Sequence, residues 1–157
     1  MKKVVYLLIT VGLLLVGCGE ETNGEKGTDL VAFDNSDLKS QLEDEPFQPK
    51  LPTELPFEVE SARVSTDPVN ERILTIDFFS KENHLSLMAT KGMKGSSNLE
   101  FEEVEIGNIQ GKYANSDQVK TIKWSEDDIQ YRFSFLGKQS KEKVTKEELI
   151  AVAESFE

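Results

Sequence analysis

Hydrophobic and polar residues alternate along most of the chain after residue 56. Successive side chains of a β-strand point to opposite faces, so apolar residues at every second position indicate strands with one buried face. The pattern predicts a strand that begins at Phe57 and further strands over residues 73–79, 85–89, 99–106, 109–114, 119–124 and 129–135. The alternation is clearest in the last of these strands, where Tyr131, Phe133 and Phe135 share one face. We therefore expect an antiparallel sheet of about six or seven strands.

Short polar stretches separate these strands and read as turns, at residues 66–68, 81–83 and 125–128 and at Gly107-Asn108. The strand over 73–79 carries apolar residues on both faces, which predicts that it runs through the middle of the sheet. Between Phe101 and Val104 the apolar positions change parity. That change predicts a bulge near Glu102-Glu103.

The end of the chain has helical periodicity and is predicted to form a helix from Thr145 to Phe156. Thr145 and Glu148 match a capping box, in which each side chain satisfies the other's backbone N–H, and Val144 stands where a hydrophobic staple begins. The apolar stripe of this helix consists of Leu149, Val152, Ala153 and Phe156. The predicted fold is therefore of the α+β class, a curved antiparallel sheet with one C-terminal helix packed on one face.

The part of the chain before the strands is acidic and then proline-rich. Residues 19–45 contain nine acidic and two basic side chains and few large apolar ones, so residues 18–45 are predicted to form a flexible tether. Within it, Leu38 and Leu42 after Asn35-Ser36-Asp37 could form one short helix, with Ser36 or Asp37 as its cap. Four prolines at positions 46, 49, 52 and 56 favour an extended segment packed on the domain. We place a single domain at residues 46–157.

The first eighteen residues have the pattern of an export signal. Lys2 and Lys3 precede an apolar run over residues 4–16, too short to span a bilayer, and Leu-Val-Gly-Cys follows at residues 15–18. This ending resembles the lipobox of bacterial lipoproteins. The resemblance implies a signal peptide at residues 1–17, cleavage before Cys18, and a diacylglycerol group on the Cys18 sulfur. The expected partner of the protein is therefore the cell membrane, to which the lipid on Cys18 would anchor it on the extracytoplasmic face.

The charge balance limits the other partners. Without Lys2 and Lys3, 16 of the 18 basic residues remain against 29 acidic ones, a formal charge of −13. Such a chain repels nucleic acid and anionic lipid headgroups, so no nucleic-acid partner is expected. Because Cys18 is the sole cysteine, no disulfide can form within the folded domain.

We find no motif that predicts catalysis. His84 is the sole histidine, so no zinc site of His and Cys ligands is expected, and Ser96 and Ser97 lie outside any nucleophile-elbow pattern. Two groups of carboxylates remain, at residues 100–105 and 126–128. We interpret the first as the solvated face of a strand and the second as turn chemistry, because nothing in the sequence makes them converge in a cleft. We therefore predict no enzyme activity, no metal and no cofactor.

The C-terminal stretch, residues 121–156, resembles an extracytoplasmic domain of unknown function from Gram-positive bacteria. That domain occurs in lipoproteins and in anti-sigma-factor-like and sporulation proteins. Its pattern is a Trp strand, an acidic turn, an aromatic strand and a closing helix. The matching residues include Trp124, Tyr131, Glu148, Leu149, Ala153 and Ser155. The resemblance implies a structural role for them; it does not extend to a spanning helix, so direct signalling to a sigma factor is not expected.

Together these patterns predict a membrane-anchored, non-enzymatic binding or interaction module of the cell envelope. Two alternatives stay open. One is a carrier or sensor of an apolar ligand, since a curved sheet with helices on its concave side resembles lipoprotein-carrier folds. The other is an envelope enzyme with an unrecognised site. The second face of the sheet separates them: a flat patch favours an envelope protein as partner, an apolar cavity favours the carrier, and a cleft with convergent carboxylates favours the enzyme.

Overall fold

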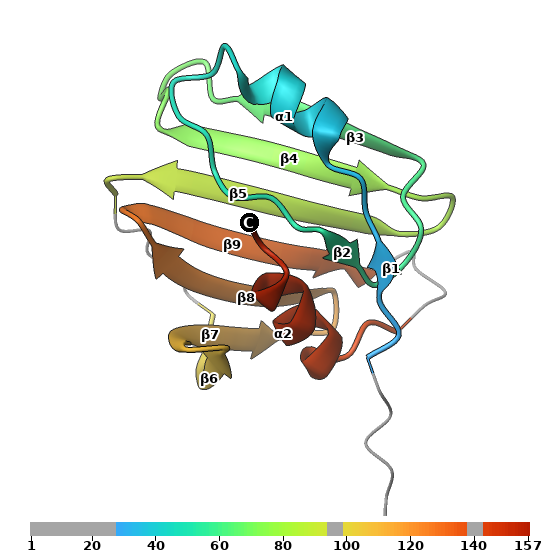
Figure 1. Cartoon of the computed structure of the whole chain (residues 1–157). Helices are drawn as coiled ribbons and strands as arrows, with labels where there is room; N and C mark the ends of the chain where they lie inside the picture. Colours follow the sequence, from blue (N-terminus) through green and yellow to red (C-terminus); the bar gives the residue numbers. More distant parts are fainter. Residues whose placement is uncertain (1–27, 94–98, 138–142) are drawn as a thin grey trace, which may run out of the picture.

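The computed structural model describes residues 28–93, 99–137 and 143–157, and the predicted signal peptide, Cys18, Ser96 and Ser97 lie outside these ranges. Its main element is one antiparallel sheet of seven strands (Figure 1). In spatial order the strands are β3 (Ser61–Thr66), β4 (Ile73–Phe79), β5 (His84–Lys91), β9 (Ile129–Leu136), β8 (Val119–Glu126), β7 (Ile109–Asn115) and β6 (Glu102–Ile106). The open, curved sheet with a C-terminal helix confirms the predicted α+β class.

Three details of the predicted sheet are wrong. The middle strand is β9, and β4 lies next to the edge strand β3. The first strand begins at Ser61, because Phe57 belongs to the preceding segment and is buried there. No bulge interrupts β6, whose pairing with β7 runs unbroken from Glu102 to Ile106. Phe101 lies before the strand, so the change of parity marks where β6 begins.

One face of the sheet is covered by four short elements. They are β1 (Val31–Ala32), α1 (Ser36–Leu42), β2 (Glu54–Leu55) and α2 (Lys146–Glu154), all on the same side in Figure 1. We call this side the covered face and the other the open face. Phe78 and Phe133 are fully buried between the layers, as are leucines and isoleucines from β4, β5 and β8. The described residues leave no buried side-chain N or O atom without a hydrogen-bond partner.

The predicted tether is wrong for the part that the structure describes. Leu38 and Leu42 of α1 are each only 2% exposed, and α1 packs beside β3. Asn35, rather than Ser36 or Asp37, is the N-cap residue, and the Asp34 carboxylate accepts a hydrogen bond from the Ser36 backbone N–H at 3.0 Å. Seven residues are enough to bury two leucines while the acidic side chains stay in water. The folded unit therefore begins before residue 46.

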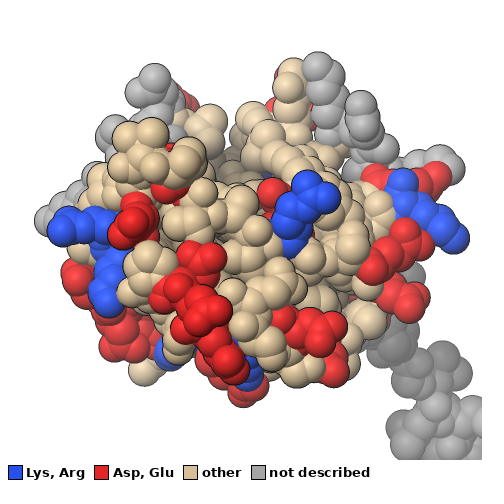
Figure 2. All heavy atoms as spheres, turned by 90° about the horizontal axis from the view of Figure 1, so that it is seen from above, with Lys and Arg blue, Asp and Glu red and all other residues tan. Residues whose placement is uncertain are grey.

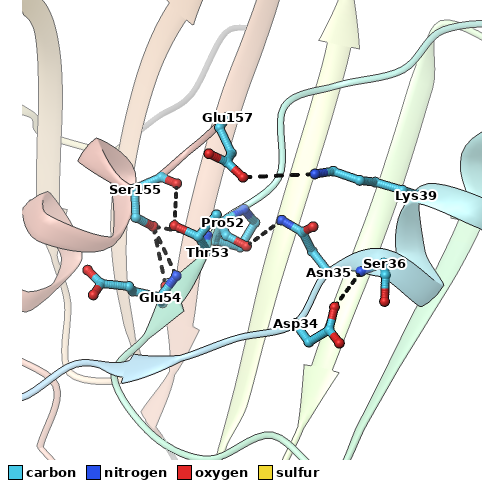
Figure 3. Close-up of polar contacts among 9 residues, drawn as sticks. All are labelled: Asp34, Asn35, Ser36, Lys39, Pro52, Thr53, Glu54, Ser155 and Glu157. Carbon is cyan, nitrogen blue, oxygen red and sulfur yellow. Dashed lines mark hydrogen bonds and ion pairs between the residues drawn. The ribbon is translucent and has the colours of Figure 1, made fainter.

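The proline-rich segment is extended and packed on the domain, as predicted. It meets the end of the chain, where Leu51 and Glu157 exchange two backbone hydrogen bonds of 3.1 Å. Figure 3 shows the contacts around this point: the Asn35 side-chain amide donates to the Pro52 carbonyl at 3.1 Å, and the Thr53 hydroxyl donates to the Ser155 carbonyl at 3.0 Å. The first and last described segments thus hold each other on the sheet.

The capping box of the closing helix is confirmed. The Glu148 backbone N–H donates to the Thr145 hydroxyl at 3.1 Å, and the Thr145 N–H donates to the Glu148 carboxylate at 2.6 Å. The helix ends at Glu154, two residues before the predicted end. Phe156 instead forms a β-bridge with Pro52, and its ring meets Trp124 edge-on, with centroids 4.9 Å apart.

Candidate functional site

Within the described residues, no helix or strand covers the open face of the sheet (Figure 1). Every second side chain of β7, β8 and β9 points to this face, and the strand pairing brings three cationic side chains together. Lys112 is paired with Lys123, and Lys123 with Arg132. We call these three residues the cationic row. It crosses three neighbouring strands and ends at Met88 on β5, the partner of Arg132.

The cationic row lies in a hollow of about 330 Å³. The hollow is lined by Met88, Thr90, Gln110, Lys112, Lys123, Trp124, Ser125, Gln130, Tyr131 and Arg132. Beside the cationic row, Ser125 is paired in register with Gln130, and Gln110 on β7 lines the same hollow, so neutral side chains lie next to the charged ones. The open face therefore combines positive charge with uncharged hydrogen-bonding groups in one concave place.

Turn chemistry explains why Lys123 and Arg132 meet. Asp127 and Asp128 have φ angles of 50° and 64°, so a two-residue turn joins β8 to β9. Such a turn fixes the register of the hairpin and places Lys123 directly opposite Arg132. Asp residues adopt this left-handed conformation at lower cost than most others.

The cationic row lacks the compensating charges found around other lysines. Lys50 lies 2.7 Å from the Glu126 carboxylate and Lys146 lies 3.0 Å from that of Glu102. Across the three described ranges, no carboxylate forms such a pair with any member of the row. The Lys123 ammonium instead lies 3.7 Å from the centroid of the Phe101 ring.

The pKa of Lys123 is lowered by burial and by its cationic surroundings. Burial lowers this pKa, and the nearby charges of Arg132 and Lys112 lower it further. Like charges directly opposite each other on neighbouring strands destabilise a sheet. The repulsion within the cationic row therefore lowers the stability of the sheet, and the fold does not need these three charges.

The residues that matched the family pattern lie mainly on the covered face and serve packing. The rings of Trp124 and Tyr131 stack with centroids 5.0 Å apart, and the Tyr131 hydroxyl accepts a hydrogen bond from the Lys50 backbone N–H at 3.0 Å. Burial raises the pKa of Tyr131. Leu149 and Ala153 are buried in α2. The Ser155 hydroxyl accepts the Thr53 backbone N–H at 3.3 Å, which ties the chain end to the segment before the sheet.

The carboxylates and the histidine singled out in the sequence have separate partners in the structure. Glu102 and Glu126 are taken up by ion pairs with Lys146 and Lys50, which hold different parts of the covered face. The His84 Nε2 atom lies 3.0 Å from the Asp77 carboxylate on the neighbouring strand. In the parts of the chain that the structure describes, no three His, Cys, Asp or Glu side chains lie where they could hold a metal ion. None of the helices described is long and apolar enough to cross a membrane.

Sequence reasoning missed the cationic row. The alternation in residues 109–114, 119–124 and 129–135 already placed Lys112, Lys123 and Arg132 on the polar side of three consecutive strands. Consecutive strands joined by short turns are neighbours in a sheet, so the shared face could have been inferred. The pattern could not show that β1, α1, β2 and α2 would all pack on the covered face and leave the cationic row without a described helix or strand over it.

Comparison with known proteins places the chain in a family. Searches among curated proteins and solved structures found no match. A family model, described as a domain of unknown function (DUF4367), matches residues 59–156. The match runs from just before β3 to Phe156, and it leaves out β1, α1 and β2. Because it covers more than half of the chain, this protein belongs to the DUF4367 family.

Proposed function

We propose that the protein is a lipid-anchored, extracytoplasmic, non-enzymatic binding module that holds its ligand on the open face of the sheet. The observation that carries this proposal is the hollow with its cationic row, because it brings together polar groups and three cationic side chains that form no ion pair with any described carboxylate. Ligand sites are concave surfaces with a few convergent polar groups. The signal-like start of the chain and Cys18 support the placement at the membrane.

The packing supports this function over that of a carrier for an apolar ligand. A carrier needs an apolar cavity, and the space between the sheet and the elements on its covered face would be the place for one. That face is occupied by side chains from α1, from residues 47–57 and from α2, and Phe78, Phe133 and Leu149 are fully buried there. The hollow on the open face is lined by the three cationic side chains and by Thr90, Gln110, Ser125 and Gln130 besides Met88, Trp124 and Tyr131, a mixture that suits a ligand with polar groups.

A photo-crosslinking experiment tests the proposed binding face. Gln110 and Gln41 are both exposed glutamines; Gln110 lines the hollow and Gln41 lies on α1 over the covered face. We expect a benzophenone amino acid at position 110 to form adducts in intact cells that make the full chain, and the same residue at position 41 to form few. Mass analysis of the peptides that carry each position measures this. Equal labelling at both positions, or none at position 110, would contradict the proposal.

The anchoring is tested separately at Cys18. Replacing Cys18 by Ser removes the one thiol that can accept a lipid, so we expect a precursor that keeps its signal and carries no diacylglycerol. The buried acyl chains of a two-chain anchor contribute about 0.8 kcal/mol per CH₂, so the wild-type protein should stay in the membrane fraction. Intact-mass measurement and fractionation check both statements. A wild-type protein with an unmodified Cys18 would rule out the anchor.

A further inference from the structure

We propose that the cationic row binds the phosphate group of a compact organic phosphate whose remaining body is uncharged. This inference rests on the proposed function and names the ligand class of the same face. It starts from an imbalance: the chain has 29 acidic and 18 basic residues, yet three of the basic side chains lie side by side on the open face, in ion pairs with none of the described acidic ones.

The absence of pairing is not due to a lack of carboxylates nearby. Glu103 on β6 is paired in register with Lys112 and its side chain belongs to the same face of the sheet, but the two charges form no ion pair. The row therefore has no carboxylate partner, and the described contact of the Lys123 ammonium is with the face of the Phe101 ring. An incoming anion would form charge-assisted hydrogen bonds with the cationic side chains and remove the mutual repulsion at the same time.

The spacing of the row suits phosphate. Neighbouring strands lie about 4.8 Å apart, so the row spans about 10 Å. One phosphate group can lie between two neighbouring cations of the row, and two linked phosphate groups can contact all three. The Arg132 guanidinium can bind two oxygens of one phosphate, and the two lysines add mobile point charges. Burial lowers the pKa of Lys123, and the charges of Arg132 and Lys112 lower it further. A bound dianion would offset the repulsion that Lys123 meets from these two side chains.

The surroundings of the row limit the rest of the ligand. The hollow of about 330 Å³ holds a small molecule, and Thr90, Gln110 and Ser125 offer it hydroxyl and amide groups. The chain as a whole has a formal net charge of −11, and acidic side chains gather along the β3 edge (Figure 2). This net charge repels an extended polyanion or an anionic bilayer more than a small phosphate ester with a neutral, hydroxyl-rich body.

Calorimetric titration of the full-length protein in a neutral detergent tests the proposal. The probes are glucose 1-phosphate and pyrophosphate, with citrate as a carboxylate of similar charge. We expect saturable binding of the phosphates at concentrations up to about 10 mM and weaker or no binding of citrate. Raising NaCl from about 0.05 M to about 0.5 M should weaken the binding. Vesicles of phosphatidylglycerol, compared with phosphatidylcholine, test whether the phosphate of a lipid headgroup is the source instead.

Charge-neutralising variants locate the site. Lys123→Gln and Arg132→Gln should each weaken phosphate binding about tenfold or more, the effect of losing one charge-assisted hydrogen bond. Lys81→Gln removes the same charge from an 85% exposed side chain in the β4–β5 turn and should leave the affinity unchanged. The thermal midpoints of Lys123→Gln and Arg132→Gln should equal or exceed that of the wild type, because each substitution relieves repulsion. A merely structural row would show the opposite, a lower midpoint.

The outcomes separate the ligand class from the binding face. No saturable phosphate binding, or equal loss in Lys81→Gln, overturns the phosphate site. Citrate binding as strong as that of the phosphates overturns the ligand class. Vesicle binding that Lys123→Gln abolishes supports the phosphate chemistry and assigns it to a lipid headgroup. If crosslinking at position 110 succeeds while every phosphate probe fails, the open face is a binding surface for another kind of ligand.

Discussion

A chain that begins at Pro46 is expected to lose about 5 kcal/mol or more of its free energy of unfolding. The truncation removes α1, whose Leu38 and Leu42 are each 2% exposed, and it uncovers the part of the core beside β3. Full burial of one leucine side chain contributes roughly 1.5–3 kcal/mol, and Leu30 and Phe33 add partly buried surface. Chemical denaturation of the two chains measures the difference. A truncated chain with unchanged stability would show that residues 28–45 contribute nothing to the fold.

Substitutions within α1 separate lost packing from lost chain. Leu38→Ala with Leu42→Ala should lower the free energy of unfolding by about 4 kcal/mol or more, since a buried leucine exchanged for alanine costs about 2–5 kcal/mol. Ser40→Ala with Gln41→Ala is the matched control, because both side chains are exposed on the same helix and alanine favours helix. The control should be as stable as the wild type.

The sequence patterns that depend on neighbours in the chain predicted the fold well. The alternation found the main strands, the capping box at Thr145 and Glu148 located the start of α2, and the turn at Asp127-Asp128 lay inside the predicted range. Patterns that depend on distant partners failed. The position of β9 in the middle of the sheet follows from its pairing with β5, some 40 positions earlier in the chain, and no local signal carries that information.

The covering elements were misread for a related reason. The composition of residues 18–45, acidic with few large apolar side chains, is typical of a disordered segment. A segment folds, however, when the rest of the domain offers an apolar surface for its few large side chains. Leu38 and Leu42 were recognised as a helical pair, but the surface beside β3 that buries them could not be seen in the sequence.

The candidate site shows the same limit. Each strand on its own presents an ordinary mixture of polar residues on its solvated side, and neither Lys112, Lys123 nor Arg132 belongs to a recognisable motif. They form a candidate site because the strand register places them side by side and because the described covering elements lie on the other face of the sheet. A charge pattern that costs stability where it lies is a stronger indication of function than one that stabilises the fold.

Phe133→Ala is expected to lower the free energy of unfolding by about 3–5 kcal/mol. Phe133 lies on the middle strand β9, is fully buried, and meets the rings of Phe78 and Phe156 edge-on, with centroids 6.2 and 6.1 Å apart. Because β9 joins the two halves of the sheet, neither half can close over the resulting cavity by moving alone. Phe133→Leu, which keeps most of the volume, should cost much less, and it serves as the measurable substitute should the alanine variant fail to fold.

The contact between Phe133 and Phe156 can be isolated because Phe156 lies at the end of the chain and is only partly buried. Phe156→Ala alone should cost less than Phe133→Ala, although its ring also meets Trp124 and Tyr131. A cycle of Phe133→Leu, Phe156→Ala and the double variant should give a coupling of about 0.5–1.5 kcal/mol, as for other buried aromatic pairs. Denaturation midpoints at constant slope measure it. Additive effects would mean that the two rings do not interact, and the contacts of Phe156 with Trp124 and Tyr131 and the hydrogen bonds between Leu51 and Glu157 would then be what holds the chain end on the sheet.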